Sequence, residues 1–165
     1  MGRHRTTSAT VRRRRIVVGG ALVTIAAVAG VVAFAAIDRS PIVIPDDPCA
    51  ERPPLRTVDG VTLQPSAMRA FRAAERTAGR DIPVVWSFRS CGQQRQACRT
   101  ICGDPGGCPG LCAPPGLSWH QLGAAIDTTE RALADERIVD ALLVNGWCQP
   151  LPSSDPGHFS FGGCH

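Results

Sequence analysis

Residues 118–127 read Ser-Trp-His-Gln-Leu-Gly-Ala-Ala-Ile-Asp, which places a histidine and an aspartate seven positions apart around a glycine. Gly123 allows a tight bend after His120, because glycine adopts backbone conformations that other residues avoid. The small apolar run 124–126 then predicts a short buried strand. The pattern therefore predicts a turn that carries His120 and a strand that delivers Asp127 at its end.

A second histidine lies near the C-terminus, in Asp-Pro-Gly-His-Phe at 155–159. The following pattern, His-Phe-Ser-Phe at 158–161, predicts a strand with the phenylalanines on the opposite face from His158. Two neighbouring strands would then direct His120, Asp127 and His158 at one point. Two imidazoles and one carboxylate suit a catalytic zinc site, whose fourth tetrahedral position is left for water. Spacing alone leaves an alternative open, in which Asp127 caps the following helix and His120 is an ordinary surface residue.

Three segments, taken in order, resemble a known family. Residues 118–127 fit S-x-H-x-x-G-x-A-x-D, the signature of the VanY-like D-alanyl-D-alanine carboxypeptidases, which are zinc peptidases that act on peptidoglycan. Ser-Phe-Arg-Ser at 87–90, with Gln94 beyond it, resembles the family's G-Y-R-S-x-x-x-Q. Asp-Pro-Gly-His-Phe at 155–159 resembles its E-P-W-H-F. The resemblance covers residues 60–163.

The resemblance implies a zinc centre with a catalytic carboxylate beside it. His120, Asp127 and His158 are the expected zinc ligands. Asp155 stands where the family has a glutamate that takes a proton from water and passes it to the leaving amine. This role is chemically reasonable, because zinc lowers the pKa of bound water to about 7 and a nearby carboxylate completes the activation.

The resemblance also implies a substrate pocket. Arg89 matches an arginine that holds the substrate and stabilises oxyanion charge, which a guanidinium does better than water in a partly dry site. Ser118 and Gln94 match polar residues that line the pocket. Two positions depart from the family. Asp155 is one methylene shorter than glutamate, and a misplacement on the ångström scale can lower a rate about 100-fold. Gly157 replaces a tryptophan, which removes an aromatic wall and loosens the loop.

Positive charge is concentrated in the N-terminal arm. Six arginines precede Asp38, the first acidic residue, and the remainder of the chain carries 12 arginines against 14 acids. A nucleic-acid-binding domain is expected to cluster basic residues on the domain itself. The sequence therefore disfavours nucleic acid as a partner.

Residues 16–37 form an uncharged run of 22 residues, and about 20 apolar residues span a bilayer. Arginines precede this run and acids follow it, so residues 1–15 are expected in the cytoplasm and the C-terminal domain outside the membrane. The run exceeds the core of a signal peptide, about 7–15 residues, which favours a single uncleaved transmembrane helix. The alternative is a cleaved signal and a secreted protein, since Ala-Phe-Ala at 33–35 satisfies the small-x-small cleavage rule.

All eight cysteines follow the apolar run. An even number on the exported side indicates a disulfide framework. The rival interpretation is a structural zinc site formed by the cysteine pairs at 98–102 and 108–112, which lack the C-x2-C spacing of many such sites. Cys148 and Cys164 flank the loop that carries His158, and we predict a disulfide between them.

The predicted organisation has four parts: a basic arm (1–15), a transmembrane helix (16–37), a Pro-rich stalk (38–54) and a carboxypeptidase-like domain (55–165). Within the domain, hydrophobic periodicity and breaker residues predict helices at 65–79, 92–100 and 130–145, strands at 82–88, 124–127 and 158–161, and a cysteine-closed loop at 103–116. The last helix is expected to direct Ile138, Val139, Leu142 and Leu143 inward. The expected fold is α+β, with helices packed on a small antiparallel sheet.

The favoured function is a zinc-dependent D-alanyl-D-alanine carboxypeptidase that trims peptidoglycan stem peptides outside the cell membrane. Two alternatives remain: a weakly active or inactive muropeptide-binding module of the same fold, and a peptidoglycan endopeptidase. The departures at Asp155 and Gly157 keep the binding module open. The sequence does not discriminate between D-Ala-D-Ala and D-Ala-D-lactate substrates.

Overall fold

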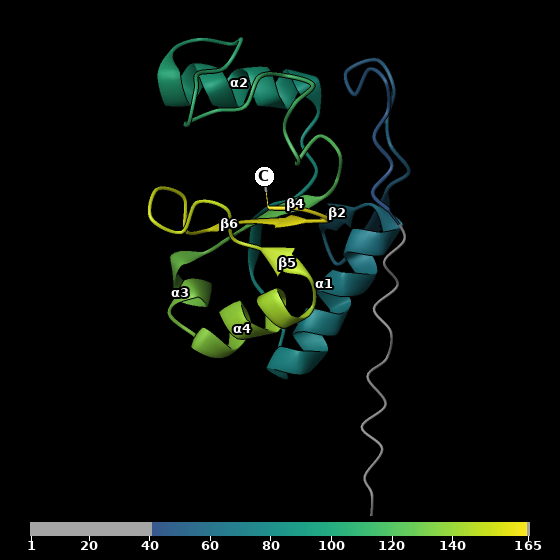
Figure 1. Cartoon of the computed structure of the whole chain (residues 1–165), viewed down its shortest axis with the longest axis vertical. Coiled ribbons are helices and arrows are strands. Elements are labelled where there is room, and N and C mark those ends of the chain that lie inside the picture. The colour runs from purple at the N-terminus through teal and green to yellow at the C-terminus, as the bar shows by residue number, and fades with distance from the viewer. Residues whose placement is uncertain (1–40, 165) are drawn as a thin grey trace, which may run out of the picture. The chain divides into compact units, whose positions relative to one another are not determined.

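The computed structural model describes residues 41–164, which form an α+β domain (Figure 1). The elements follow in the order β1 (Arg56–Val58), β2 (Val61–Leu63), α1 (Pro65–Ala78), β3 (Val84–Trp86), α2 (Cys91–Cys102), β4 (Ala125–Thr128), α3 (Glu130–Leu133), α4 (Glu136–Val144), β5 (Trp147–Cys148) and β6 (His158–Phe161). The expected α+β class is confirmed.

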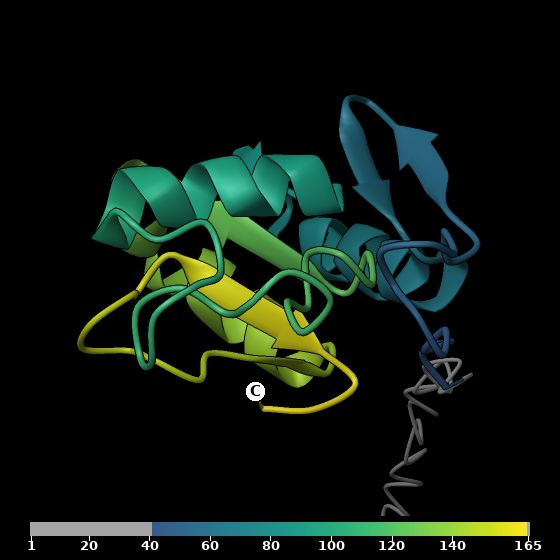
Figure 2. The ribbon, with the colours of Figure 1, turned by 90° about the horizontal axis from the view of Figure 1, so that it is seen from above.

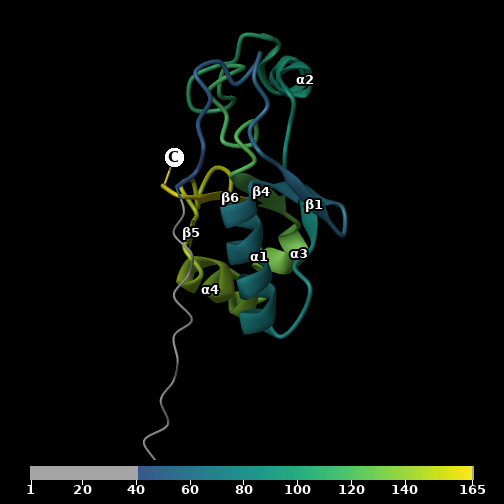
Figure 3. The same cartoon turned by 90° about the vertical axis from the view of Figure 1, so that its right-hand side faces the viewer.

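The central sheet is antiparallel, with strand order β3-β4-β6-β5. Helices α1, α3 and α4 lie on one side of this sheet, whereas α2 and the long loop that follows it lie on the other (Figures 1 and 3). The pair β1–β2 forms a separate two-stranded hairpin that extends to one side, as Figure 2 shows. The side of the sheet that faces α2 is where the polar residues of the motifs gather.

The hydrophobic core joins the sheet to α1 and α4. The helix α1 buries the stripe Met68, Phe71 and Ala74, as its 3.6-residue periodicity predicts. It ends at Gly79, whose left-handed φ of 70° provides the C-cap. Trp147 of β5 packs edge-on against Phe71, with ring centroids 6.3 Å apart.

The segment expected as one helix, 130–145, is two helices. Asp135 interrupts it with an extended backbone, and its carboxylate accepts a hydrogen bond from the backbone N–H of Arg137. Short polar side chains favour this capping position over a helix interior, which explains the break. Ile138 and Leu142 are buried as expected, and Val139 packs against the core, but the inward orientation predicted for Leu143 is wrong, since 45% of this residue is exposed.

Other elements differ from the expectation in length or were missed. The strand expected over 82–88 is limited to β3, and α2 is longer at both ends than 92–100. The hairpin β1–β2 was not predicted, although its turn contains Asp59 and Gly60, both with positive φ. An Asp-Gly pair between β-rich residues is a strong hairpin signal.

Four disulfides close the domain: Cys49–Cys91, Cys98–Cys112, Cys102–Cys108 and Cys148–Cys164. The predicted Cys148–Cys164 pair is confirmed. The cysteines at 98–102 and 108–112 form two disulfides, so they do not form the rival zinc site. Two bridges tie α2 to the loop that follows it, and this loop has turns and one isolated bridge but no regular element, as expected.

The first described residues pack against the domain. Gln64 exchanges hydrogen bonds with the backbone of Val43, and Ile42 packs against the core. The predicted arm and transmembrane helix (1–37), together with the start of the stalk, lie outside the described residues. Among residues 41–164 no helix is both long enough and apolar enough to cross a membrane.

Candidate metal centre

Two of the predicted ligands come from neighbouring strands. The register of β4 and β6 places Asp127 directly opposite His158. Side chains of such a pair stand on the same face of the sheet, about 5 Å apart at Cβ. The imidazole Nδ1 of His158 lies 2.9 Å from Asp127 Oδ1.

The third predicted ligand comes from the turn that leads into β4. Gly123 has a φ of 63°, and its N–H donates to the His120 carbonyl at 3.1 Å. The backbone N–H of Arg89 donates to the same carbonyl, also at 3.1 Å. A Cβ at Gly123 would lie 2.5 Å from Leu55 Cδ2 and 3.1 Å from the backbone nitrogen of Gln64. The glycine is thus required both by its φ and by close packing, and the predicted tight bend is confirmed.

The three side chains converge as a potential metal-binding group. His120 Nε2 lies 3.1 Å from Asp127 Oδ1 and 3.3 Å from His158 Nδ1, and the third separation is the 2.9 Å given above. Ligand atoms about 2.0–2.1 Å from one zinc ion in tetrahedral geometry are themselves about 3.3–3.4 Å apart. The observed separations are close to that value, so the donor set fits zinc in both chemistry and spacing.

The tautomer of His120 supports this fit. Its Nδ1 lies 2.6 Å from the backbone carbonyl oxygen of Ser87, and a carbonyl can only accept, so we assign the hydrogen to Nδ1. The Nε2 lone pair of the neutral ring then faces Asp127 Oδ1, which is also an acceptor. A cation between them satisfies both atoms. Metal-binding histidines commonly have their second ring nitrogen held by a carbonyl or carboxylate in this way.

Asp127 is the most perturbed acid of the site. Burial disfavours its charged form, but its interactions with the His120 and His158 rings outweigh burial and hold the pKa of this carboxyl well below its usual range. Its second oxygen, Oδ2, accepts from the guanidinium of Arg89 at 3.3 Å. Asp127 is therefore ionised at any physiological pH, as a metal ligand requires.

Arg89 places a partly buried cation beside the ligands, with 12% of its side chain exposed. Burial lowers the pKa of its guanidinium, while the charges of Asp127 and Asp155 act in the opposite direction. Its guanidinium also lies over the ring of Trp86, 5.5 Å from the ring centroid. An arginine pinned in this way stabilises negative charge that develops next to it.

A cleft of about 410 Å³ opens above the three ligands. The polar predicted residues Arg89, Gln94, Ser118 and Asp155 all line it, together with His120, Asp127 and His158. Its lining also includes four exposed apolar residues, Ile101, Leu111, Leu117 and Leu151. The structure therefore brings every sequence-predicted site residue to one cleft.

Asp155 and Gly157, the two residues that differ from the VanY-like motif, lie in different environments. Asp155 is exposed, and its carboxylate makes no hydrogen bond within residues 41–164. Gly157 lies against β4, where its carbonyl accepts from Thr128 N–H at 2.9 Å. A Cβ at this position would lie 3.0 Å from Thr128 O, so a larger residue requires a shift of the loop. Two tryptophans elsewhere in the domain differ in location: Trp119 lines the cleft, whereas Trp147 is buried in the core.

Sequence reasoning missed two supporting groups. One is the Ser87 carbonyl, which orients His120; a backbone atom leaves no sequence signal of such a role. The other is Gln121, which is buried and accepts from the Gly116 N–H at 2.7 Å, thereby holding the cysteine-closed loop against the turn that carries His120.

Comparison with known proteins shows a shared fold. No protein-family model and no curated protein matches the sequence. Among solved structures, the domain is similar to a mutant of the vancomycin-resistance D,D-pentapeptidase VanY, from a VanB-type resistance cassette, in complex with Zn(II). The TM-score is 0.52 at 16% sequence identity, over 67% of this chain and 79% of that chain. This similarity supports the VanY-like fold that the motifs predict and, at this identity, concerns the fold alone.

Proposed function

We propose that this domain is a zinc-dependent hydrolase of the D-alanyl-D-alanine carboxypeptidase type that trims peptidoglycan stem peptides. One observation carries the proposal: the ligand atoms of His120, Asp127 and His158 meet at zinc-like separations in a cleft that also contains Arg89 and Asp155. The fold similarity to a zinc-bound D,D-pentapeptidase supports it.

The three converging residues, His120, Asp127 and His158, would hold the metal. When bound, zinc acts as a Lewis acid that polarises a carbonyl group and lowers the pKa of water to about 7. The Ser87 carbonyl keeps the His120 ring in the ligand tautomer. Asp155, whose carboxylate is exposed in the wall of the cleft, takes a proton from the attacking water and delivers it to the leaving amine.

Arg89 binds the negative charge of the substrate. Asp127 and Gln94 accept from its two terminal nitrogens, at 3.3 and 3.0 Å, which fixes the plane of the guanidinium. A guanidinium has five N–H donors, so others remain for a substrate carboxylate or a developing oxyanion. Ser118, buried in the wall, completes the polar lining.

The test is hydrolysis of a peptide that ends in D-Ala-D-Ala by the zinc-loaded protein. We expect release of the terminal D-alanine, and none from a matched peptide that ends in L-Ala-L-Ala. Cross-linked muropeptides and D-Ala-D-lactate peptides, assayed in parallel, distinguish an endopeptidase and a depsipeptidase. A zinc-loaded protein that hydrolyses none of these substrates contradicts the proposal.

The second candidate is a muropeptide-binding module without turnover. Asp155 favours it, because this carboxylate is shorter than the family's glutamate and has no hydrogen-bond partner among the described residues to orient it. This candidate predicts saturable binding of muropeptides to the zinc-loaded protein, with no released D-alanine after prolonged incubation.

The proposed location is the outer side of the cell membrane, with the N-terminus inside. The disulfides suit an oxidising compartment. Protease added to intact cells should release a fragment that begins in residues 38–54. Digestion that occurs only after lysis would contradict this topology.

A further inference from the structure

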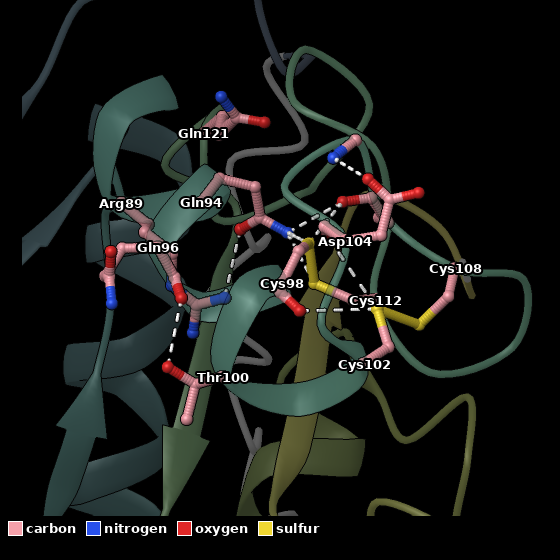
Figure 4. The surroundings of a disulfide bond; sticks show 12 residues. Arg89, Gln94, Gln96, Cys98, Thr100, Cys102, Asp104, Cys108, Cys112 and Gln121 are labelled. Atoms are coloured by element: carbon pink, nitrogen blue, oxygen red, sulfur yellow. Dashed lines mark hydrogen bonds between the residues drawn. A yellow bond between two sulfur atoms is a disulfide. The ribbon is translucent and has the colours of Figure 1, made fainter.

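Gln94 lies in the wall of the cleft and is almost fully buried, with 2% of its surface exposed. Both ends of its side-chain amide are engaged by the protein (Figure 4). The oxygen Oε1 accepts from Arg89 at 3.0 Å, and the nitrogen Nε2 donates to the Ala113 carbonyl at 2.8 Å. Nε2 also lies 3.6 Å from Cys98 Sγ and 3.4 Å from Cys112 Sγ.

The amide thus joins the arginine to the disulfide-closed loop. Cys98 in α2 and Cys112 in the loop are bonded, which fixes the position of the Ala113 carbonyl next to α2. Ala113 in turn orients the Gln94 amide so that its oxygen faces Arg89. Buried polar groups are costly to leave without partners, and this chain of contacts gives each end of the amide one.

The guanidinium of Arg89 donates to two side-chain acceptors, Gln94 and Asp127, and the bond to Gln94 limits how far the guanidinium turns toward Asp127. One terminal nitrogen bonds Asp127 and the other bonds Gln94. Without Gln94, Asp127 is the remaining side-chain acceptor among the described contacts of this guanidinium. Because arginine and carboxylate groups prefer a bidentate pair, the guanidinium would then rotate toward Asp127 and away from the open cleft.

On the basis of the proposed function, we propose that Gln94 is a positioning residue that aims Arg89 at the substrate through the Cys98–Cys112 loop and does not itself contact the substrate. This differs from the substrate-lining role that the family resemblance implies. The proposal also implies a role for the Cys98–Cys112 disulfide, because this disulfide holds the Ala113 carbonyl that orients the Gln94 amide.

The first measurement needs no activity. In the metal-free, oxidised protein, the side-chain N–H resonances of Arg89 are assigned by comparison with Arg89→Lys. We expect Gln94→Met, which conserves volume, and Gln94→Asn, which is too short to bridge both partners, to shift or broaden the Arg89 resonances. The matched control is Gln96→Leu, on the exposed surface of the same helix, which should leave them unchanged. Unchanged Arg89 resonances in a folded Gln94 variant overturn the inference.

The second measurement is a double-mutant cycle in the zinc-loaded protein. Gln94→Met should lower kcat about 10- to 100-fold, the range for a misplaced catalytic group, with zinc content unchanged. Gln94→Glu keeps the acceptor for Arg89 and should recover part of the loss. In an Arg89→Ala background, Gln94→Met should cost nothing more, because its effect passes through the arginine. Additive losses, with a rise in KM, would mean that Gln94 contacts the substrate and would overturn the inference.

The two measurements separate this inference from the proposed function. A wild-type protein without hydrolase activity, in which Gln94→Met still displaces the Arg89 resonances, contradicts the function and supports the positioning role. An active protein in which substitution of Gln94 changes neither the Arg89 resonances nor kcat supports the function and contradicts the positioning role.

Discussion

Asp127 and His158 are direct cross-strand partners, and their facing atoms, Oδ1 and Nδ1, lie 2.9 Å apart. A slip of one residue between β4 and β6 would turn one of them to the opposite face of the sheet. The proposed metal site therefore depends on strand register. Changes that disturb the turn before β4 or the loop before β6 should weaken metal binding as well as stability.

The turn before β4 provides the first test. Gly123→Ala forces a left-handed φ on a residue with a Cβ, which costs about 1–2 kcal/mol, and adds a clash with Leu55 and Gln64. We therefore expect Gly123→Ala to lose more unfolding free energy than the cost of the left-handed φ alone. We also expect it to bind zinc more weakly. Gly103→Ala is the matched control, since its φ is 75° and nothing lies near the added Cβ. Equal losses in the two variants, by denaturant unfolding, would contradict this prediction.

The bridge behind β6 provides the second test. The Cys148–Cys164 disulfide spans 16 positions of sequence and closes the loop that carries Asp155. Replacing both cysteines with serine should lower the unfolding free energy by about 3 kcal/mol and weaken zinc binding. The corresponding double variant of Cys102 and Cys108, six positions apart, should cost less and leave zinc affinity unchanged. The reverse order of effects would argue against a role for this loop in the site.

Stability should depend on pH through Asp127. Its pKa in the folded state lies below the ordinary value of about 3.9, so its ionised form stabilises the fold above that pH, and this stabilisation is lost as pH falls toward the folded-state pKa. In the metal-free protein, Asp127→Asn should cost about 1.5–3 kcal/mol at pH 6, and the cost should shrink below pH 3.9. A loss of unfolding free energy in Asp127→Asn that stays constant from pH 6 to about pH 2 would contradict this prediction.

The proposed catalytic role of Asp155 can be tested by changing the charge and the length of its side chain. Asp155→Asn should retain zinc and lose about 100-fold or more in kcat, the scale of general-base catalysis. Asp155→Glu introduces the side chain that the VanY-like family has at the matching position and should maintain or raise kcat. Because Asp155 is exposed and outside the ligand group, both variants should fold with wild-type stability. Full activity in Asp155→Asn would assign the proton transfer to another group.

The site was predictable because its signals are local. Gly123 between His120 and Asp127 sets the turn within ten residues, and the alternation from His158 onward sets β6. Features that depend on distant partners were not predictable. The Ser87 carbonyl opposite His120 and the Ala113 carbonyl opposite Gln94 are backbone atoms brought together by the fold, 33 and 19 positions away.

The misses in the fold have related causes. The break at Asp135 reflects a cap that competes with helical periodicity over 130–145. The short β5 is defined by its pairing with β6 and has too few residues to show a period. The hairpin at Asp59 has a local sequence signal, its Asp-Gly turn. This signal was overlooked because it lies between the more prominent patterns of the predicted stalk and the predicted helix.

The central claim is that His120, Asp127 and His158 hold one zinc ion. Anomalous diffraction at the zinc edge, from crystals of the oxidised protein loaded with zinc, tests it most directly. The account predicts one strong anomalous peak, about 2.0–2.2 Å from His120 Nε2, Asp127 Oδ1 and His158 Nδ1, which His120→Ala abolishes. Zinc-loaded crystals with no peak among these three atoms, or with the peak retained in His120→Ala, would contradict it.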